Sequence, residues 1–404
     1  MPVLLTLQWR RIAPLLLFGA VATLSPFAGQ EHGSEAAHQT PAVIATIPLA
    51  PGEYPVGIAA DPTHGRVIVA KHRDPPPDAR LSVIDTTTHV ETSSIQINAT
   101  SLYTIGVNPT TNRAYALDAF SNILFIVDLS SNSVVTSLST HNVSPYGLAV
   151  DSARNLIYWL DASDEVAVVD GTTDAIIATI QVALTPPYFD EVRDVAVNSM
   201  TNRIYVTYSI GGSIGELVVI DGSSHDILER IAVGTVPEAV AVNELTNRIY
   251  VNHGSNFISV IDGASNQIIA SITTDFQVGR LAVNQTTNHL YATKGGSILV
   301  IDGSTNLITN ELTIGRSLGL AVDSSNDRVY AGSSVIGDGA IQPPSPSQTP
   351  PPAVVVGGAI TLPDTGGPTR TLHPALPLAA GVAVLFALAV VVAVARSHRR
   401  RTSV

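Results

Sequence analysis

The sequence predicts an all-β fold, a seven-bladed β-propeller of four-stranded antiparallel blades. First, a strand–turn–strand pattern occurs seven times, at intervals of 39 to 47 residues. Second, each complete copy continues with another apolar hairpin, so that one copy supplies four strands. Third, only 13% of the 404 residues are charged, while 30 are Gly and 26 are Pro, which suits short strands joined by many turns.

The first hairpin of each copy is marked by an Asp or Asn that ends its first strand. We call this residue the anchor Asx, and its copies are Asp61, Asn108, Asp151, Asn198, Asn243, Asn284 and Asp323. Four residues further on, each copy carries a residue type that adopts the left-handed conformation easily: Gly65, Asn112, Asn155, Asn202, Asn247, Asn288 and Asp327. The spacing predicts a tight turn, closed by the anchor side chain on the backbone ahead.

The return strand of this hairpin carries two further repeated residue types. Seven positions after the anchor stands a residue that favours strands: Ile68, Tyr115, Tyr158, Tyr205, Tyr250, Tyr291 and Tyr330. Two residues before it, five copies have Arg66, Arg113, Arg203, Arg248 and Arg328, and the others have Leu156 and His289. A ring of arginines could form an anion site. We expect instead solvated side chains at the hairpin edge, with their stems on the sheet.

The second hairpin is an apolar strand, a turn that begins with Asp, and another apolar strand. Examples are 217-LVVIDGSSHDILERI-231 and 258-ISVIDGASNQIIASI-272. The repeated aspartates are Asp85, Asp128, Asp170, Asp221, Asp262 and Asp302. Because each one holds the same turn position in its own copy, we interpret them as turn formers and not as catalytic carboxylates.

The seventh copy lacks its last strand, and the N-terminal part of the chain contains a match for it. After residues 319–334 only 335-VIGDGAI-341 precedes Pro-rich sequence, whereas 43-VIATIPL-49 resembles outer strands such as 176-IIATIQV-182. We therefore expect residues 43–49 to complete the last blade and to close the ring, which removes an exposed sheet edge. A six-bladed ring with a stray hairpin is the alternative.

Segments such as 240-VAVNELTNRIYVN-252 and 258-ISVIDG-263 resemble the YVTN-type β-propeller repeat, which is related to prokaryotic surface-layer propellers. The resemblance covers roughly residues 42–340. This sequence departs from the family pattern at Gly65 and Ile68 in the first copy and at Leu156 and Trp159 in the third. The resemblance implies the fold and no catalytic residue, because propellers carry many activities.

The N-terminal residues 1–30 have the layout of a secretory signal peptide. Arg10 and Arg11 precede an apolar run over residues 12–24, and a membrane anchor is the alternative interpretation. A short spacer over residues 31–41 then leads to the propeller, which we assign to residues 42–341.

The C-terminal region reads as a stalk followed by an anchoring signal. A Pro-rich linker over 342–361 precedes Leu362, Pro363, Asp364, Thr365 and Gly366, then an apolar run over 375–395 that is long enough for a transmembrane helix, then 396-RSHRRR-401. The order, over residues 362–404, resembles the LPxTG cell-wall sorting signal. The resemblance implies that a sortase cuts after Thr365 and links it to peptidoglycan. The alternative is a single-pass membrane protein with a cytoplasmic C-terminus.

Three insertions, 71–80, 183–194 and 208–216, should emerge on one face of the propeller, opposite the repeated turns. Loops on a rigid scaffold often carry function. The candidate ligand-binding rim is Lys71, His72, Arg73, Tyr188, Phe189, Asp190, Glu191 and Arg193. The other interpretation is that the insertions are tolerated and bind nothing.

Charge and residue usage limit the possible functions. The formal net charge is −12, and loss of the two ends removes seven of the 21 basic residues, which argues against nucleic-acid binding. No Cys is present and the His residues are scattered, so we expect no metal and no cofactor. The sequence favours a monomeric, wall-anchored surface module that binds a glycan or protein, and not an enzyme. The alternative is an enzyme of the lactonase-like or lyase-like propeller type that uses the loop-rich face.

Overall fold

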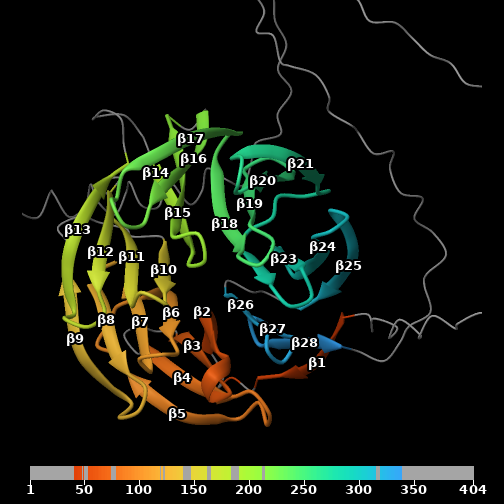
Figure 1. The fold of residues 1–404 in the computed structure, drawn as a ribbon. Coiled ribbons are helices and arrows are strands. Elements are labelled where there is room, and N and C mark those ends of the chain that lie inside the picture. Colours follow the sequence, from red (N-terminus) through yellow and green to blue (C-terminus); the bar gives the residue numbers. More distant parts are fainter. Residues whose placement is uncertain are drawn as a thin grey trace, which may run out of the picture. The chain divides into compact units, whose positions relative to one another are not determined.

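The computed structural model describes residues 41–338, except for 48, 50–52, 74–78, 119, 122, 140–146, 162–164, 183–190, 212–213 and 315–318. The described residues form seven four-stranded antiparallel sheets arranged as blades around a centre (Figure 1). They contain no α-helix, and a single turn of 3-10 helix spans Pro62–His64. The predicted seven-bladed, all-β propeller is confirmed, and the six-bladed alternative is wrong.

We number the blades along the chain and give their strands from the centre outward. Blade 1 contains β2 (Glu53–Asp61), β3 (Arg66–Arg73), β4 (Arg80–Asp85) and β5 (Glu91–Gln96). Blade 2 contains β6 (Leu102–Asn108), β7 (Arg113–Asp118), β8 (Ile123–Asp128) and β9 (Ser133–Ser139). Blade 3 contains β10 (Leu148–Asp151), β11 (Leu156–Asp161), β12 (Glu165–Asp170) and β13 (Ala175–Gln181). Blade 4 contains β14 (Glu191–Asn198), β15 (Arg203–Ile210), β16 (Ile214–Asp221) and β17 (Ile227–Gly234).

The remaining blades follow the same order. Blade 5 contains β18 (Pro237–Asn243), β19 (Arg248–His253), β20 (Phe257–Asp262) and β21 (Gln267–Thr273). Blade 6 contains β22 (Leu281–Asn284), β23 (His289–Lys294), β24 (Ser297–Asp302) and β25 (Leu307–Thr313). Blade 7 contains β26 (Leu320–Asp323), β27 (Arg328–Ala331), β28 (Ser334–Asp338) and β1 (Pro41–Thr46). In blades 1 to 6 the turns between the first and second strands and between the third and fourth strands emerge on one side, which we call the turn face, and so does the β26–β27 turn of blade 7. The other connections emerge on the opposite side, the loop face.

Strand β1 closes the ring as the outer strand of blade 7. It pairs antiparallel with β28, and the Ile47 amide donates to the Ser333 carbonyl at 2.7 Å. The Ile47 side chain is only 2% exposed and packs with Ile58 and Tyr330 between blades 7 and 1. The predicted closure is therefore confirmed, although the strand covers residues 41–46 and not 43–49.

The repeated turns adopt the predicted backbone. The residues four positions after the anchors have φ between 50° and 60°. The aspartates of the second hairpin accept backbone N–H bonds from the turn, as Asp262 does from Ala264 at 3.0 Å and from Ser265 at 2.9 Å. These bonds lower the pKa of Asp262 to about 2. The aspartates are thus turn formers, as the sequence predicts.

The repeated side chains on the turn face also connect neighbouring blades. Anchor amides donate to the turn residue of the next blade, for example Asn198 Nδ2 to Asn247 Oδ1 at 3.0 Å and Asn243 Nδ2 to Asn288 Oδ1 at 2.8 Å. Arg203 Nη1 donates to the Gly263 carbonyl of the next blade at 3.1 Å. Arg66 and Arg113 make equivalent contacts, at 3.3 Å to the Leu129 carbonyl and 3.1 Å to the Gly171 carbonyl. The prediction that these arginines are merely solvated is wrong, because three of them bridge blades.

Candidate ligand site in the central channel

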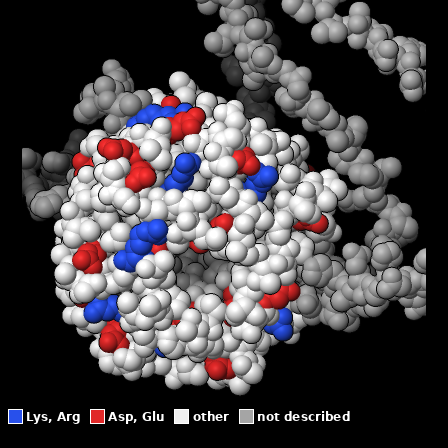
Figure 2. Space-filling model, viewed as in Figure 1, with Lys and Arg blue, Asp and Glu red and all other residues white. Residues whose placement is uncertain are grey.

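The seven inner strands line a central channel, and two repeat positions form its wall. Position −3, three residues before the anchor Asx, is aliphatic in every blade: Ile58, Ile105, Leu148, Val195, Val240, Leu281 and Leu320. Position −4 holds Gly57, Thr104, Gly147, Asp194, Ala239, Arg280 and Gly319. The space-filling view shows a hollow at the centre of the ring (Figure 2). All seven residues of position −3 and five of position −4 (not Gly147 or Ala239), with Val56, line a cavity of about 180 Å³.

The aliphatic residues at position −3 pack mainly between the blades. Each belongs to a different apolar cluster or packs against one: Ile58, Ile105, Val195 and Val240 are buried, and Leu148, Leu281 and Leu320 are partly buried. Since these side chains are directed into the interblade layers, the cavity surface that they leave is largely backbone and the residues of position −4. Polar groups therefore determine what the cavity can bind.

Position −4 is charged in only two blades, and they face the same cavity. Five blades carry Gly, Ala or Thr there, whereas blade 4 carries Asp194 and blade 6 carries Arg280. At Gly147 and Gly319 a side chain would meet a neighbouring residue: a Cβ on Gly147 would lie 2.6 Å from Leu160 Cδ1, and one on Gly319 would lie 2.7 Å from Ile58 Cγ1. Asp194 and Arg280 therefore depart from the structural rule of their own repeat.

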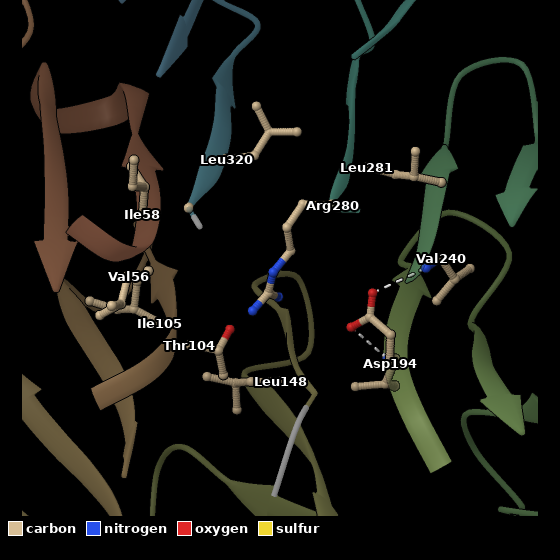
Figure 3. Close-up of a pocket in the computed structure, with 13 residues that line it drawn as sticks. Val56, Ile58, Thr104, Ile105, Leu148, Asp194, Val240, Arg280, Leu281 and Leu320 are labelled. Carbon is tan, nitrogen blue, oxygen red and sulfur yellow. Dashed lines mark hydrogen bonds between the residues drawn. The ribbon is translucent and has the colours of Figure 1, made fainter. Parts of the chain in front are cut away.

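Asp194 is held rigidly by two backbone amides. Its Oδ1 accepts from the Val195 N–H at 3.0 Å, and its Oδ2 accepts from the Val240 N–H of the next blade at 3.0 Å (Figure 3). Desolvation by the surrounding walls raises the pKa of Asp194 to about 6, although the Arg280 charge and the two N–H bonds act in the opposite direction. The side chain stays half-buried and faces the cavity. At neutral pH it is therefore mostly ionised, at a cost in stability.

Arg280 reaches into the channel from the start of β22. Its guanidinium carbon lies 5.1 Å from the centre of the Tyr103 ring, which belongs to blade 2 on another part of the wall. Figure 3 shows the side chain extending across the cavity, between Thr104 and Asp194. Among the described residues no carboxylate forms an ion pair with Arg280, and Figure 3 shows its guanidinium apart from the Asp194 carboxylate, on which its charge acts.

Backbone groups of position −3 also point into the channel. Position −4 bonds to the second strand, as shown by the Thr293 N–H to Arg280 carbonyl bond at 3.0 Å and the Gly332 N–H to Gly319 carbonyl bond at 3.1 Å. Since an antiparallel ladder alternates between bonded and non-bonded pairs, the N–H and C=O of position −3 turn away from that strand. The Val240 N–H, which reaches Asp194, confirms this direction. The wall therefore offers both hydrogen-bond donors and acceptors.

The predicted rim residues are only partly within the described structure. Lys71 is 5% exposed, and its Nζ donates to Glu91 Oε2 at 2.6 Å and to Glu53 Oε2 at 3.4 Å, so its charge is neutralised within blade 1. Arg193 lies half-buried in β14, and Glu191 begins that strand. His72 and Arg73 end β3, but their side chains lie outside the described part. Tyr188, Phe189 and Asp190 lie outside the described residues, and the rim stays a prediction.

The terminal segments also lie outside the described residues. These are the signal peptide (1–30), the linker (342–361), the sorting signal with Thr365 and the apolar run (375–395). Within the described residues, no helix is long and apolar enough to cross a membrane. No group of His, Asp or Glu side chains there is placed to hold a metal ion.

The sequence interpretation missed Asp194 and Arg280, although their signal is present in the repeat. Aligning the copies on the anchor Asx shows that only these two have a charged residue at position −4. The deviation from the repeat, and not the repeat itself, indicates the site.

Fold and channel together define the class of protein: a seven-bladed β-propeller with one acidic residue, Asp194, and one basic residue, Arg280, facing its central cavity. No family model matches the chain, and no curated protein matches it.

Proposed function

We propose that the propeller is a ligand-binding module whose ligand enters the central channel. The observation that carries this proposal is the placement of Asp194 and Arg280 at equivalent positions, where the other blades have uncharged residues. Asp194 is ionised there at the expense of stability, as its raised pKa shows. The simplest reason to retain a charge that weakens the fold is that the charge takes part in binding.

The module is proposed to act as a monomer on the cell surface, as a YVTN-type propeller bound to the wall. The repeated anchor and turn motifs support the family proposal. The order of signal peptide, Pro-rich linker, LPDTG pentapeptide, apolar run and arginines supports secretion and anchoring. Sortase and peptidoglycan are then partners through Thr365, and the ligand is a small molecule or the part of a glycan or protein that enters the channel.

A binding screen tests the module itself. Residues 31–361 contain the whole closed ring, because both β1 and β28 lie within them. We expect immobilised propeller to retain at least one compound from a collection of metabolites, glycans and surface proteins, with 1:1 stoichiometry. Failure to retain any of them, with a correctly folded protein, would contradict the proposal.

Substitution of Thr365 tests the anchoring. Thr365→Ala alters the side chain of the residue whose carbonyl the sortase attacks, so the variant should remain in the detergent-soluble membrane fraction with its arginines attached. Wild type should require wall digestion for release and should end at Thr365, as mass spectrometry of its C-terminal peptide shows. Wild-type protein found wholly in detergent, with Arg399–Arg401 intact, would instead establish a plain membrane anchor.

An enzyme of the lactonase-like or lyase-like type is the second candidate, and one observation favours it. An Asp with a pKa of about 6 titrates near neutral pH, as a general acid or base requires. Stoichiometric metal in the purified propeller, or turnover of a lactone that is lost in Asp194→Ala, would support this candidate. Binding of the same compound without turnover would support the module.

A further inference from the structure

We propose that the central cavity binds a small zwitterion, a molecule that carries one ammonium and one carboxylate group, between Asp194 and Arg280. This inference rests on the proposed binding function and names the ligand class of that site. The first argument is charge. An anion alone would be repelled by the Asp194 carboxylate and a cation alone by the Arg280 guanidinium, whereas a ligand with both charges is attracted by each.

The carboxylate of the ligand is placed at the Arg280 side of the cavity. Gly57 and Gly319 leave the wall open there, because they have no Cβ to cover the neighbouring blade. A Cβ on Gly57 would lie 3.3 Å from the Ile105 nitrogen, and one on Gly319 would lie 3.2 Å from the Ile58 nitrogen. The N–H groups of Ile58 and Ile105, which belong to position −3, point into the channel. With the Arg280 guanidinium they form a set of donors for a carboxylate.

The ammonium of the ligand is placed at Asp194. Each carboxylate oxygen accepts one backbone N–H, from Val195 and Val240, and an ionised oxygen has a further lone pair for a second donor. The inward carbonyls of position −3 supply additional acceptors. The two backbone bonds fix the carboxylate, so little conformational entropy is lost when a ligand binds.

The size of the cavity limits the ligand to a small one. The cavity of about 180 Å³ is close in size to an engineered protein cavity of about 150 Å³ that binds benzene, so it accommodates a free amino acid and not a disaccharide. The scarcity of apolar side-chain surface on the wall argues against a large apolar substituent. Glycine, β-alanine and 4-aminobutyrate, which differ in the separation of their charges, are therefore the probes.

Isothermal titration calorimetry of residues 31–361 with these probes tests the inference. We expect at least one of the three to bind, and its affinity to fall by roughly ten- to hundredfold in Asp194→Ala and in Arg280→Ala, since each loses a charged partner. Propionate and propylamine, which have one charge each, should bind more weakly than the zwitterion by a similar factor. Alanine is a suitable replacement, because blade 5 carries Ala239 at this position.

A matched control separates the site from general charge effects. Lys294 in blade 6 pairs with Asp275 at 2.8 Å and Glu311 at 2.9 Å and does not line the cavity, so Lys294→Ala should bind the probe as wild type does. Circular dichroism and the urea midpoint establish that each variant is folded.

Three results would overturn the inference: no probe binds at millimolar concentration, a probe binds equally well to both alanine variants, or propionate binds as tightly as the zwitterion. If the screen still identifies another ligand, the binding function stands and only the ligand class is wrong. If neither experiment finds a ligand, both proposals fail.

Discussion

The turn face and the central channel are built from the same inner strands, yet they differ in how strictly they follow the repeat. On the turn face, all four Asn anchors join one blade to the next with the same bond, from the anchor amide to the turn residue. Asn198–Asn247, Asn243–Asn288 and Asn284–Asp327 are examples. In the channel, position −4 follows the repeat in most blades and departs from it at Asp194 and Arg280. Uniformity thus marks the framework, and deviation marks the candidate site.

The largest loss of stability should follow from opening the ring of blades at β1. Deletion of residues 41–47 removes β1, exposes the edge of β28 and removes the buried Ile47 side chain. Burial of one such side chain stabilises by about 1.5–3 kcal/mol, so with the lost strand pairing we expect a loss of several kcal/mol in the free energy of unfolding. Urea denaturation measures it.

Deletion of residues 31–40 is the control for the β1 deletion and should leave the midpoint unchanged. An unchanged midpoint after loss of 41–47 would mean that closure by β1 does not stabilise the ring.

The second effect tests the uniform turn face. Asn247 has φ of 52°, and its Oδ1 accepts from the buried Asn198 amide at 3.0 Å. Asn247→Val should cost roughly 2–4 kcal/mol, because it combines a strained backbone with a lost hydrogen bond. Asn247→Gly relieves the strain and loses only the bond, at about 1–2 kcal/mol.

Asn247→Asp is the matched control, because blade 7 uses Asp327 at this position with the same bond from Asn284. It should be nearly neutral. If Gly and Val were equally destabilising in urea unfolding, the left-handed backbone would not be the reason for Asn here.

The third effect concerns acid stability. His253 is fully buried beside Phe257, and desolvation lowers its pKa from 6.5 to about 4. The unfolded chain therefore gains the proton first, so the contribution of His253 is fully present above pH 6.5 and is lost as the pH falls towards 4. In His253→Gln this loss is absent. Between pH 7 and pH 4.5 the stability difference between wild type and variant should shift against wild type by on the order of 1–3 kcal/mol. A constant difference would contradict a neutral, buried histidine.

The smallest effect at neutral pH should come from the channel. In Asp194→Ala the lost N–H bonds are offset by removal of a desolvated charge, so stability at pH 7 should change by about 1 kcal/mol or less. The pH dependence should change more clearly. Because the folded pKa of Asp194 is raised from 3.8 to about 6, its contribution is present below pH 3.8 and is lost as the pH rises through 6. Relative to wild type, the variant should become less stable on acidification from pH 7 to pH 4. The opposite trend, measured by urea unfolding, would mean that Asp194 stabilises the framework as an ion.

The periodic part of the fold could be predicted from the sequence, because the same turn residues recur at the same spacing in every copy. The left-handed turns need Gly, Asn or Asp, the second hairpins need an Asp that binds its own turn, and both requirements act within a few residues. The outer strand supplied by residues 41–46 was also predictable, since its pattern matches the outer strands of complete blades. The bridging role of Arg66, Arg113 and Arg203 was not, because their acceptors lie 58 to 63 residues away.

By itself the sequence determined the number of blades, their strands and turns, and how the ring closes, since these depend on periodicity and on short-range turn chemistry. Only the tertiary structure decided that Asp194 and Arg280, which are 86 positions apart in the sequence, face one cavity. The reason is geometric. Ring closure brings the inner strands of all blades to a common axis, so residues that are equivalent in the repeat but distant along the chain become neighbours in space. Residues on separate inner strands acquire a shared environment only when that axis forms, and the raised pKa of Asp194 is a property of that assembled wall.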